Sequence, residues 1–341
     1  MRNRKLTALL TGSIAIALVA AVAGTGLAAG SKKAAAGDTC LVTDVGGLND
    51  RSFNQLANKG RLDGEKLLGV KTNVFISTKE ADYNPNLLAC AQSGADLTIA
   101  VGFLMADQLN SVATKFPNSK FAIIDFPYQA LASKPANTRG ILFREQEAGY
   151  LAGWLAIKTL MSQKKPLVIG AVGGLKIPPV DHYIAGYQAG AKAANPKAKV
   201  LFGYSQDFAD QSKCKEISLN HIAQGSQAEF QVAGGCGLGS LSAAKDKGIW
   251  GIGVDADQAY LGAHILTSAV KRVDAGVLRT MKQAKTGTFK GYGNTTFSVR
   301  AGGVGLGKIS AKVPAAIVAA EKILEQQLRT GKVKGIPTEV K

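Results

Sequence analysis

The sequence lacks the motifs of several common enzyme classes. It contains no G-x-S-x-G turn, no phosphate-loop lysine and no G-x-G-x-x-G segment after an apolar run. This argues against a nucleophile-elbow hydrolase, a nucleoside triphosphatase and a dinucleotide-dependent oxidoreductase. The only histidines are His182, His221 and His264, which are too widely spaced along the chain to indicate a metal site. We therefore expect a protein that is not an enzyme and that holds no cofactor or metal.

Cysteine, aromatic residues and acidic residues are also scarce. The four cysteines include no C-x-x-C pair, which argues against redox or zinc chemistry. Aromatic residues make up 6% of the chain, and 41 Lys and Arg outnumber 24 Asp and Glu, for a formal net charge of +17. The basic residues are scattered and do not interleave with aromatic ones, so we expect no nucleic acid partner. The excess charge is better explained by solvated faces and attraction to an anionic cell envelope.

The first long apolar run lies at the N-terminus. Arg2, Arg4 and Lys5 precede the run from Leu6 to Val22, and small residues follow from Gly24 to Gly30. This layout predicts a secretory signal peptide over residues 1–29 and an exported protein. A run that reaches Ala29 is also long enough to remain as an uncleaved membrane anchor.

No lipid-attachment motif precedes the first cysteine. Cys40 follows Gly37-Asp38-Thr39, which is not a lipidation box. We therefore expect a periplasmic or cell-surface protein without a lipid anchor.

Apolar runs rich in Val, Ile and Phe alternate with helical segments along the rest of the chain. This alternation predicts an α/β fold with parallel sheets covered by helices. The expected strands are residues 40–44, 72–77, 97–101, 121–125, 140–143, 167–172, 199–204, 230–233 and 249–254. A further helix is expected over Ser310 to Arg329, because apolar residues recur there at helical spacing.

The predicted topology suggests how the cysteines pair. Cys40 begins a strand and Cys90 ends the helix around residues 86–92, so both should lie at the N-terminal edge of a sheet. Cys214 begins a helix and Cys236 follows a strand, so both should lie at a C-terminal edge. We therefore expect two disulfides, Cys40 with Cys90 and Cys214 with Cys236, as is usual for an even number of cysteines in an exported chain. Free buried thiols are the alternative.

The segment from Val42 to Asn54 indicates a binding site. It combines a buried strand, a Gly46-Gly47 turn and a polar helix start that carries Phe53. Ligands of open α/β sheets bind at the C-terminal edge of parallel strands, where a following helix offers free N–H groups. Two alternatives stay open: the polar turn could be only a helix cap, and Phe53 could belong to the core.

Several motifs in order along the chain resemble the basic membrane protein family, the substrate-binding receptors of ABC importers that include purine nucleoside receptors. The motifs are residues 42–54, 143–153, 170–174 with Pro178, 186–187 with 195–196, 233–237 and 253–258. The resemblance implies two doubly wound parallel-sheet lobes with a ligand cleft between them, as in type I periplasmic binding proteins. Cys214 and Cys236 depart from the family pattern, in which small residues are usual at both positions.

The expected lobes are discontinuous in sequence. We assign residues 38–144 plus 256–291 to the N-terminal lobe and residues 145–255 plus 292–330 to the C-terminal lobe. The chain should cross between lobes near residues 143–146, 255–266 and 292–304.

The resemblance also implies roles for individual residues. Phe53 and Phe208 would stack on the two faces of a purine base, and Asp125 would accept a hydrogen bond from its edge. Asp255 and Lys271 would hold the ribose hydroxyls, together with a backbone group near Gly235, with Lys271 expected on an exposed helix. Asp44 and Asn54 would support the pocket wall, and Asn49 completes the expected site.

The predicted function is that of a monomeric extracytoplasmic receptor that closes on a purine nucleoside and delivers it to an ABC transporter permease. Two alternatives use the same architecture. One is a receptor for a sugar or another small polar metabolite. The other is a ligand sensor that acts through a membrane signalling partner.

Overall fold

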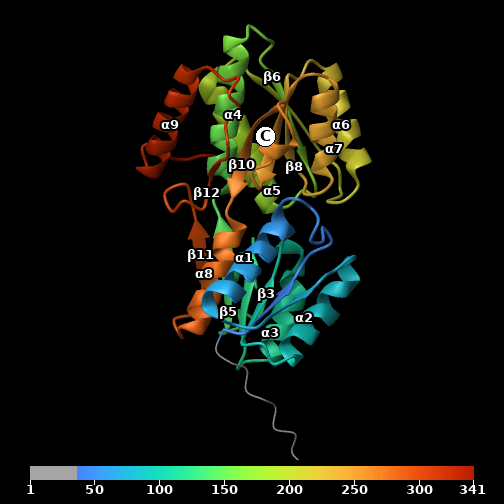
Figure 1. Cartoon of the computed structure of the whole chain (residues 1–341), viewed down its shortest axis with the longest axis vertical. Helices are drawn as coiled ribbons and strands as arrows, with labels where there is room; N and C mark the ends of the chain where they lie inside the picture. Colours follow the sequence, from blue (N-terminus) through green and yellow to red (C-terminus); the bar gives the residue numbers. More distant parts are fainter. Residues whose placement is uncertain (1–36) are drawn as a thin grey trace, which may run out of the picture. The chain divides into compact units, whose positions relative to one another are not determined.

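A computed structural model describes residues 37–341, which form two six-stranded sheets flanked by helices (Figure 1). The predicted signal peptide, residues 1–29, lies outside the described residues. We call each sheet with the helices packed on it a lobe.

The first lobe is built on a fully parallel sheet. Its strand order is β11-β5-β4-β3-β1-β2. The strands are β1 (Thr39–Val42), β2 (Thr72–Phe75), β3 (Leu97–Ala100), β4 (Lys120–Ile124), β5 (Thr138–Phe143) and β11 (Asn294–Phe297). The helices are α1 (Phe53–Leu68), α2 (Tyr83–Gln92), α3 (Ala106–Lys115) and α8 (Val273–Lys285). Strands β1 and β3 are fully buried, as expected for central strands covered on both faces.

The second lobe repeats this arrangement in the order β12-β10-β9-β8-β6-β7. All its neighbouring strands are parallel except β12, which pairs antiparallel with β10. The strands are β6 (Val168–Gly173), β7 (Lys199–Tyr204), β8 (Ala228–Val232), β9 (Trp250–Asp255), β10 (Ile265–Lys271) and β12 (Val304–Leu306). The helices are α4 (Glu145–Ser162), α5 (Pro178–Ala194), α6 (Gln211–Ala223), α7 (Gly237–Asp246) and α9 (Ala315–Arg329).

All nine predicted strands are present, but three more strands were not expected. The most consequential is β10, because its last residue, Lys271, was expected on an exposed helix. Lys271 instead ends a buried strand and is itself 2% exposed. Strand β10 carries Thr267 and Ser268, which interrupt the apolar run that would have identified it.

The sheets also correct the expected lobe ranges. Strand β10 belongs to the second sheet although residues 256–291 were expected in the N-terminal lobe, and β11 belongs to the first sheet although residues 292–330 were expected in the C-terminal lobe. The chain crosses between the sheets around Arg144 and between β11 and β12, as expected, but the middle crossing lies at Arg272 and not within residues 255–266. The physical reason is that β9 and β10 pair as neighbours in one sheet.

Glycines allow two helices of the second lobe to pack closely. A Cβ atom at Gly190 of α5 would lie 1.9 Å from the Tyr150 carbonyl oxygen of α4, and one at Gly153 of α4 would lie 2.1 Å from that of Tyr187. Real Cβ contacts are never so short, so these helices can meet backbone to backbone only because both positions lack side chains. This contact fixes α5, whose first turns reach the functional site.

Both predicted disulfides are present. Cys40 of β1 is bonded to Cys90 of α2, with Cα atoms 5.5 Å apart, and Cys214 of α6 is bonded to Cys236, with Cα atoms 5.6 Å apart. All four residues are fully buried.

Replacing Glu321 of α9 by glutamine is expected to make the stability less sensitive to pH. Burial, with help from the nearby Glu325 carboxylate, raises the pKa of Glu321 to about 7. Because this pKa is raised on folding, its contribution to stability is present below about pH 4.5 and is lost as the pH rises toward 7. Thermal unfolding should show Glu321→Gln more stable than the parent at pH 8, by on the order of 2 kcal/mol after allowance for partial solvation, and similar at pH 4. The exposed Glu216→Gln is the control, and an equal gain at both pH values would refute the assignment.

Candidate functional site

One cavity lies between the carboxyl ends of strands from both sheets. The space within it, including the part open to solvent, is about 620 Å³. Each sheet has the order 2-1-3-4-5 in its first five strands, and the cavity lies where that order reverses, at the position where ligands of doubly wound sheets bind. The residues that line it are Asp44, Gly46, Asp50, Phe53, Asn54, Gly102, Phe103, Leu104, Asp125, Ile177, Pro179, Val180, Tyr183, Phe208, Val232, Gly234, Val254, Asp255 and Lys271.

The cavity has an aromatic residue from each lobe. Phe53 is the first residue of α1, and its ring lies against Gly102, where a Cβ atom would be 3.5 Å from ring atom Cε1. Phe208 follows β7 and covers Gly174, where a Cβ atom would be 2.2 Å from Cε1 of the Phe208 ring. Both rings are partly buried. Phe53 and Phe208 therefore offer one flat apolar group from each lobe.

A group of buried polar side chains organises the start of α1. Asn54 Nδ2 donates to Asp44 Oδ1 at 2.6 Å and to Asp50 Oδ2 at 3.1 Å. Asp50 also accepts hydrogen bonds from the backbone N–H groups of Ser52, Asn54 and Gln55, and so satisfies the free donors at the helix start. Burial raises the pKa of Asp44 to about 6. This group supports the cavity wall that carries Phe53.

Lys271 is the centre of a buried charge network. Its Nζ atom lies 2.5 Å from Asp125 Oδ2 and 3.1 Å from Glu145 Oε1, and Glu145 Oε2 lies 3.1 Å from His182 Nδ1. The same ammonium lies 4.9 Å from the centre of the Phe53 ring and 5.2 Å from that of Phe143. Burial alone would lower the pKa of Lys271, but the neighbouring carboxylates raise it above its ordinary value, so Lys271 remains charged.

Asp125 keeps one acceptor free. Its Oδ2 atom is paired with Lys271, whereas Oδ1 is buried and has no hydrogen-bond partner among the described residues. Burial raises the pKa of Asp125 above its ordinary value. A buried acceptor without a partner is costly, and a ligand N–H or O–H that reached it would relieve that cost.

Asp255 links the two lobes. Its Oδ2 atom accepts a hydrogen bond from Ser52 Oγ of the first lobe at 2.7 Å, and its Oδ1 atom accepts one from Tyr183 Oη of α5 at 3.3 Å. The amide of Gln258 adds a second contact, with Nε2 donating to the Arg51 carbonyl oxygen at 3.3 Å. The structure thus shows the two lobes in direct contact beside the cavity.

Two of the site's carboxylates lie on left-handed backbone. Asp125 has a φ of 67° and Asp255 has a φ of 58°, backbone angles that residues other than Gly, Asn and Asp rarely adopt. Each residue ends or follows a strand, where the unusual backbone turns the chain away from the sheet. Such conformations are often found at functional sites.

The cavity brings together seven of the nine residues expected from the sequence. They are Asp44, Phe53, Asn54, Asp125, Phe208, Asp255 and Lys271. Asn49 is exposed in the turn before α1 and does not line the cavity. Gly235 does not line it either, but its neighbour Gly234 does. Lys271 was expected to act with Asp255 on a ribose, but its direct partners are Asp125 and Glu145.

Four residues at or beside the cavity were not expected from the sequence, namely Asp50, Glu145, Phe103 and Tyr183. Asp50 could have been recognised, since an Asp just before an apolar helix is a cap signal. The others carry no local signal. Tyr183 lines the cavity because α5 packs tightly on α4, and Phe103 because it follows β3 at the same sheet edge as β1 and β4.

The arrangement suits binding more than catalysis. Apolar rings face a cavity whose polar groups are mainly carboxylates that are already engaged with hydrogen-bond donors. Such a set can orient a neutral ligand through its N–H and O–H groups. Two α/β lobes with a ligand cavity between them define the class of solute-binding proteins with the type I periplasmic binding protein fold.

Comparison with known proteins identifies the family within this class. The chain belongs to the Bmp family, whose model, described as ABC transporter substrate-binding protein PnrA-like, matches residues 38–336.

Individual relatives agree with this assignment. The ABC transporter nucleoside-binding protein BmpA of Lactococcus lactis subsp. cremoris is 33% identical over 290 residues, which cover 78% of this chain and 80% of BmpA. An uncharacterised lipoprotein of Pyrococcus abyssi is 34% identical over 317 residues, covering 89% of this chain and 77% of the relative. The crystal structure of an ABC transporter solute-binding protein from Aeropyrum pernix K1 superposes with a TM-score of 0.79 at 26% identity, covering 88% of this chain and 93% of that one.

The chain is therefore a non-enzymatic, extracytoplasmic solute-binding protein of an ABC transporter, with a ligand and a membrane transporter as partners. Between residues 37 and 341, no helix combines the length and the apolar character needed to cross a bilayer.

Proposed function

We propose that this protein binds a purine nucleoside in the cavity between its lobes and presents it to the permease of an ABC importer. The observation that carries the proposal is that Phe53 of one lobe and Phe208 of the other line a single cavity with Asp125, whose Oδ1 atom lacks a partner. A purine has two flat faces for the rings and an edge with N–H groups for a carboxylate. Stacking on an aromatic side chain is worth roughly 1 to 3 kcal/mol per base.

The ribose would be held by the part of the cavity wall that carries Asp255. Asp255, Tyr183 and Ser52 form a hydrogen-bonded group there, and a diol could bond to Asp255 in addition to or in place of Ser52. A carboxylate can accept four hydrogen bonds, so its present partners leave capacity for hydroxyl groups. The nucleoside-binding description of the Lactococcus lactis relative supports the same class of ligand.

The mechanism we propose is closure of the lobes on the ligand. We place the first lobe at residues 38–143 with 273–297 and the second at 145–271 with 304–330, joined by crossings at Arg144, Arg272 and residues 298–303. A ligand held by rings from both lobes favours the closed form, because only that form makes both sets of contacts. We further propose that the protein acts as a monomer in the periplasm or at the cell surface.

A calorimetric screen of the mature chain tests the ligand class. Adenosine, guanosine and inosine should bind with measurable heat, and free bases should bind more weakly because they lack the ribose contacts. Glucose, galactose and ribose serve as controls for the sugar alternative. Binding of a sugar without binding of any nucleoside would overturn the purine proposal and leave the family assignment intact.

A further inference from the structure

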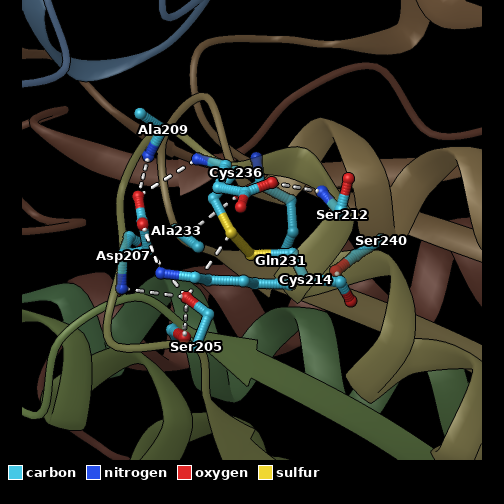
Figure 2. Close-up of a disulfide and its surroundings, with 12 residues drawn as sticks. Ser205, Asp207, Ala209, Ser212, Cys214, Gln231, Ala233, Cys236 and Ser240 are labelled. Atoms are coloured by element: carbon cyan, nitrogen blue, oxygen red, sulfur yellow. Dashed lines mark hydrogen bonds and ion pairs between the residues drawn. A yellow bond between two sulfur atoms is a disulfide. The ribbon is translucent and has the colours of Figure 1, made fainter.

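The Cys214–Cys236 disulfide lies against the loop that carries Phe208. This loop, residues 205–210, connects β7 to α6. The bond joins the first turn of α6 to the residue that precedes α7, and both cysteines are fully buried (Figure 2). Cys236 therefore lies next to the loop, and Cys214 lies just after it in sequence.

Contacts of Cys236 hold the loop against the rest of the lobe. The Cys236 backbone N–H donates to the Phe208 carbonyl oxygen at 3.0 Å. Cys236 Sγ lies 3.4 Å from Ser205 Oγ at the start of the loop. On the same side, Cβ atoms placed at Gly234 and Gly235 would lie 3.4 and 3.3 Å from the Phe208 carbonyl oxygen, so the two backbones are close. The backbone of Phe208 is thus fixed mainly through the segment that ends at Cys236.

Strand β6 holds the start of the loop, since the Ser205 and Gln206 N–H groups donate to the Gly173 and Gly174 carbonyl oxygens at 2.9 and 3.1 Å. The bonds of the loop beyond Gln206 are internal or lie at the surface. Ser205 Oγ donates to the Asp207 carbonyl oxygen at 2.8 Å, and Asp207 Oδ1 accepts from the Ala209 and Asp210 N–H groups (Figure 2). Asp207 Oδ2 pairs with the half-exposed Lys213. The bonds around Asp207 shape the loop, whereas the Phe208 carbonyl oxygen is held by the Cys236 N–H. Gln206 also has a φ of 55°, an unfavourable value that a freed loop could relax.

We propose that the Cys214–Cys236 disulfide positions Phe208 for ligand binding. The inference rests on the proposed function, in which Phe208 covers one face of the ligand. A bond between α6 and residue 236 restricts the positions open to the loop, so less conformational freedom is lost when the ligand orders the ring. Without the bond, part of the binding free energy would be used to order the loop, so the affinity for the ligand would be lower.

The second disulfide provides a matched control. Cys40–Cys90 has nearly the same Cα separation and is equally buried, but it joins β1 to α2 in the other lobe, and neither cysteine lines the cavity. Removal of either bond should lower the melting temperature. Only removal of Cys214–Cys236 should alter the Phe208 loop.

The test compares Cys214→Ala/Cys236→Ala with Cys40→Ala/Cys90→Ala by calorimetry, using adenosine, guanosine and inosine in turn. The first variant should bind about tenfold more weakly than the parent, and the second should bind within about twofold of it. In a Phe208→Ala background, removal of the Cys214–Cys236 bond should change affinity by less than about twofold, because the ring that it positions is already absent. An equal loss in both backgrounds would mean that the disulfide stabilises the lobe without positioning Phe208.

Hydrogen exchange separates this inference from the proposed function. Amides of residues 205–210 and of residue 236 should exchange faster in the Cys214→Ala/Cys236→Ala variant. They should exchange at the parent rate in the Cys40→Ala/Cys90→Ala variant. If the parent binds no nucleoside, the proposed function fails, while the exchange measurement still decides whether the disulfide holds the loop. Unchanged exchange at residues 205–210 would overturn the inference whatever the ligand.

Discussion

Replacing Lys271 by methionine is expected to destabilise the protein by about 3 to 5 kcal/mol. The substitution keeps most of the side-chain volume but leaves Asp125 Oδ2 and Glu145 Oε1 without their cation in a site where both residues are almost fully buried. Breaking a buried ion pair by removing one partner typically costs this much, because the remaining charge is uncompensated. Thermal unfolding should show a melting temperature lower by roughly 10 °C.

The pH dependence of this loss identifies its cause. Without Lys271, the pKa values of both carboxyls should rise, so protonation at low pH should relieve the repulsion. The variant should therefore be closer to the parent at pH 5 than at pH 8. The triple substitution Lys271→Met/Asp125→Asn/Glu145→Gln should recover much of the stability at pH 8, since no buried charge then lacks a partner.

Lys59 provides the control for Lys271. It lies 2.5 Å from Asp63 in an exposed ion pair on α1, with 55% of its side chain exposed. Lys59→Met should change the stability by less than about 1 kcal/mol. A Lys271→Met variant as stable as Lys59→Met would show that the buried network does not contribute as described.

Removing the two aromatic rings of the cavity is expected to have the largest effect on ligand binding. Phe53→Ala and Phe208→Ala should each weaken nucleoside binding by about 5- to 150-fold, the equivalent of 1 to 3 kcal/mol. Each substitution removes one face of the proposed stack, and the double variant should bind more weakly than either single variant. Calorimetry with the nucleoside that binds the parent most tightly gives these ratios directly.

Two variants control for loss of structure. Phe202→Ala removes a phenyl ring from β7 that is 41% exposed and does not line the cavity, and it should leave the affinity unchanged. Phe53→Trp retains a stacking surface and should retain more affinity than Phe53→Ala. If Phe53→Ala binds as tightly as the parent while its unfolding is normal, Phe53 belongs to the packing of α1 and not to the ligand site.

The two sets of substitutions act on connected groups. The Lys271 ammonium lies over the Phe53 ring and pairs with Asp125, so the charge network and the aromatic wall meet at one residue. Lys271 ends β10 one residue before the chain crosses to the first lobe. A charge placed at a crossing and paired with the opposite lobe couples the packing at that crossing to the shape of the cavity.

Much of this protein follows from local sequence patterns. The apolar runs predict nine of the strands, and central strands such as β1 and β3 are apolar throughout because they are buried on both faces. The pairing of Cys40 with Cys90 and of Cys214 with Cys236 follows from the edge of the sheet at which each cysteine lies. The glycine turn before Phe53 places that ring at the C-terminal edge of the first strand, and the order of the motifs indicates the family.

Only the tertiary structure decided the role of Lys271 and the path of the chain around it. Strand β10 contains Thr267 and Ser268, and their hydroxyls are satisfied by the Gly307 carbonyl oxygen and the Gln258 backbone N–H, partners that lie elsewhere in the fold. A local pattern cannot show that polar groups will be paired in a core, so β10 was not recognised and the second crossing was misplaced. The burial of Lys271 depends in turn on Asp125 and Glu145, which are more than 120 residues away in sequence. Hydrophobic periodicity determines which segments form strands and helices, whereas the position of a charge depends on which strand ends the topology brings together.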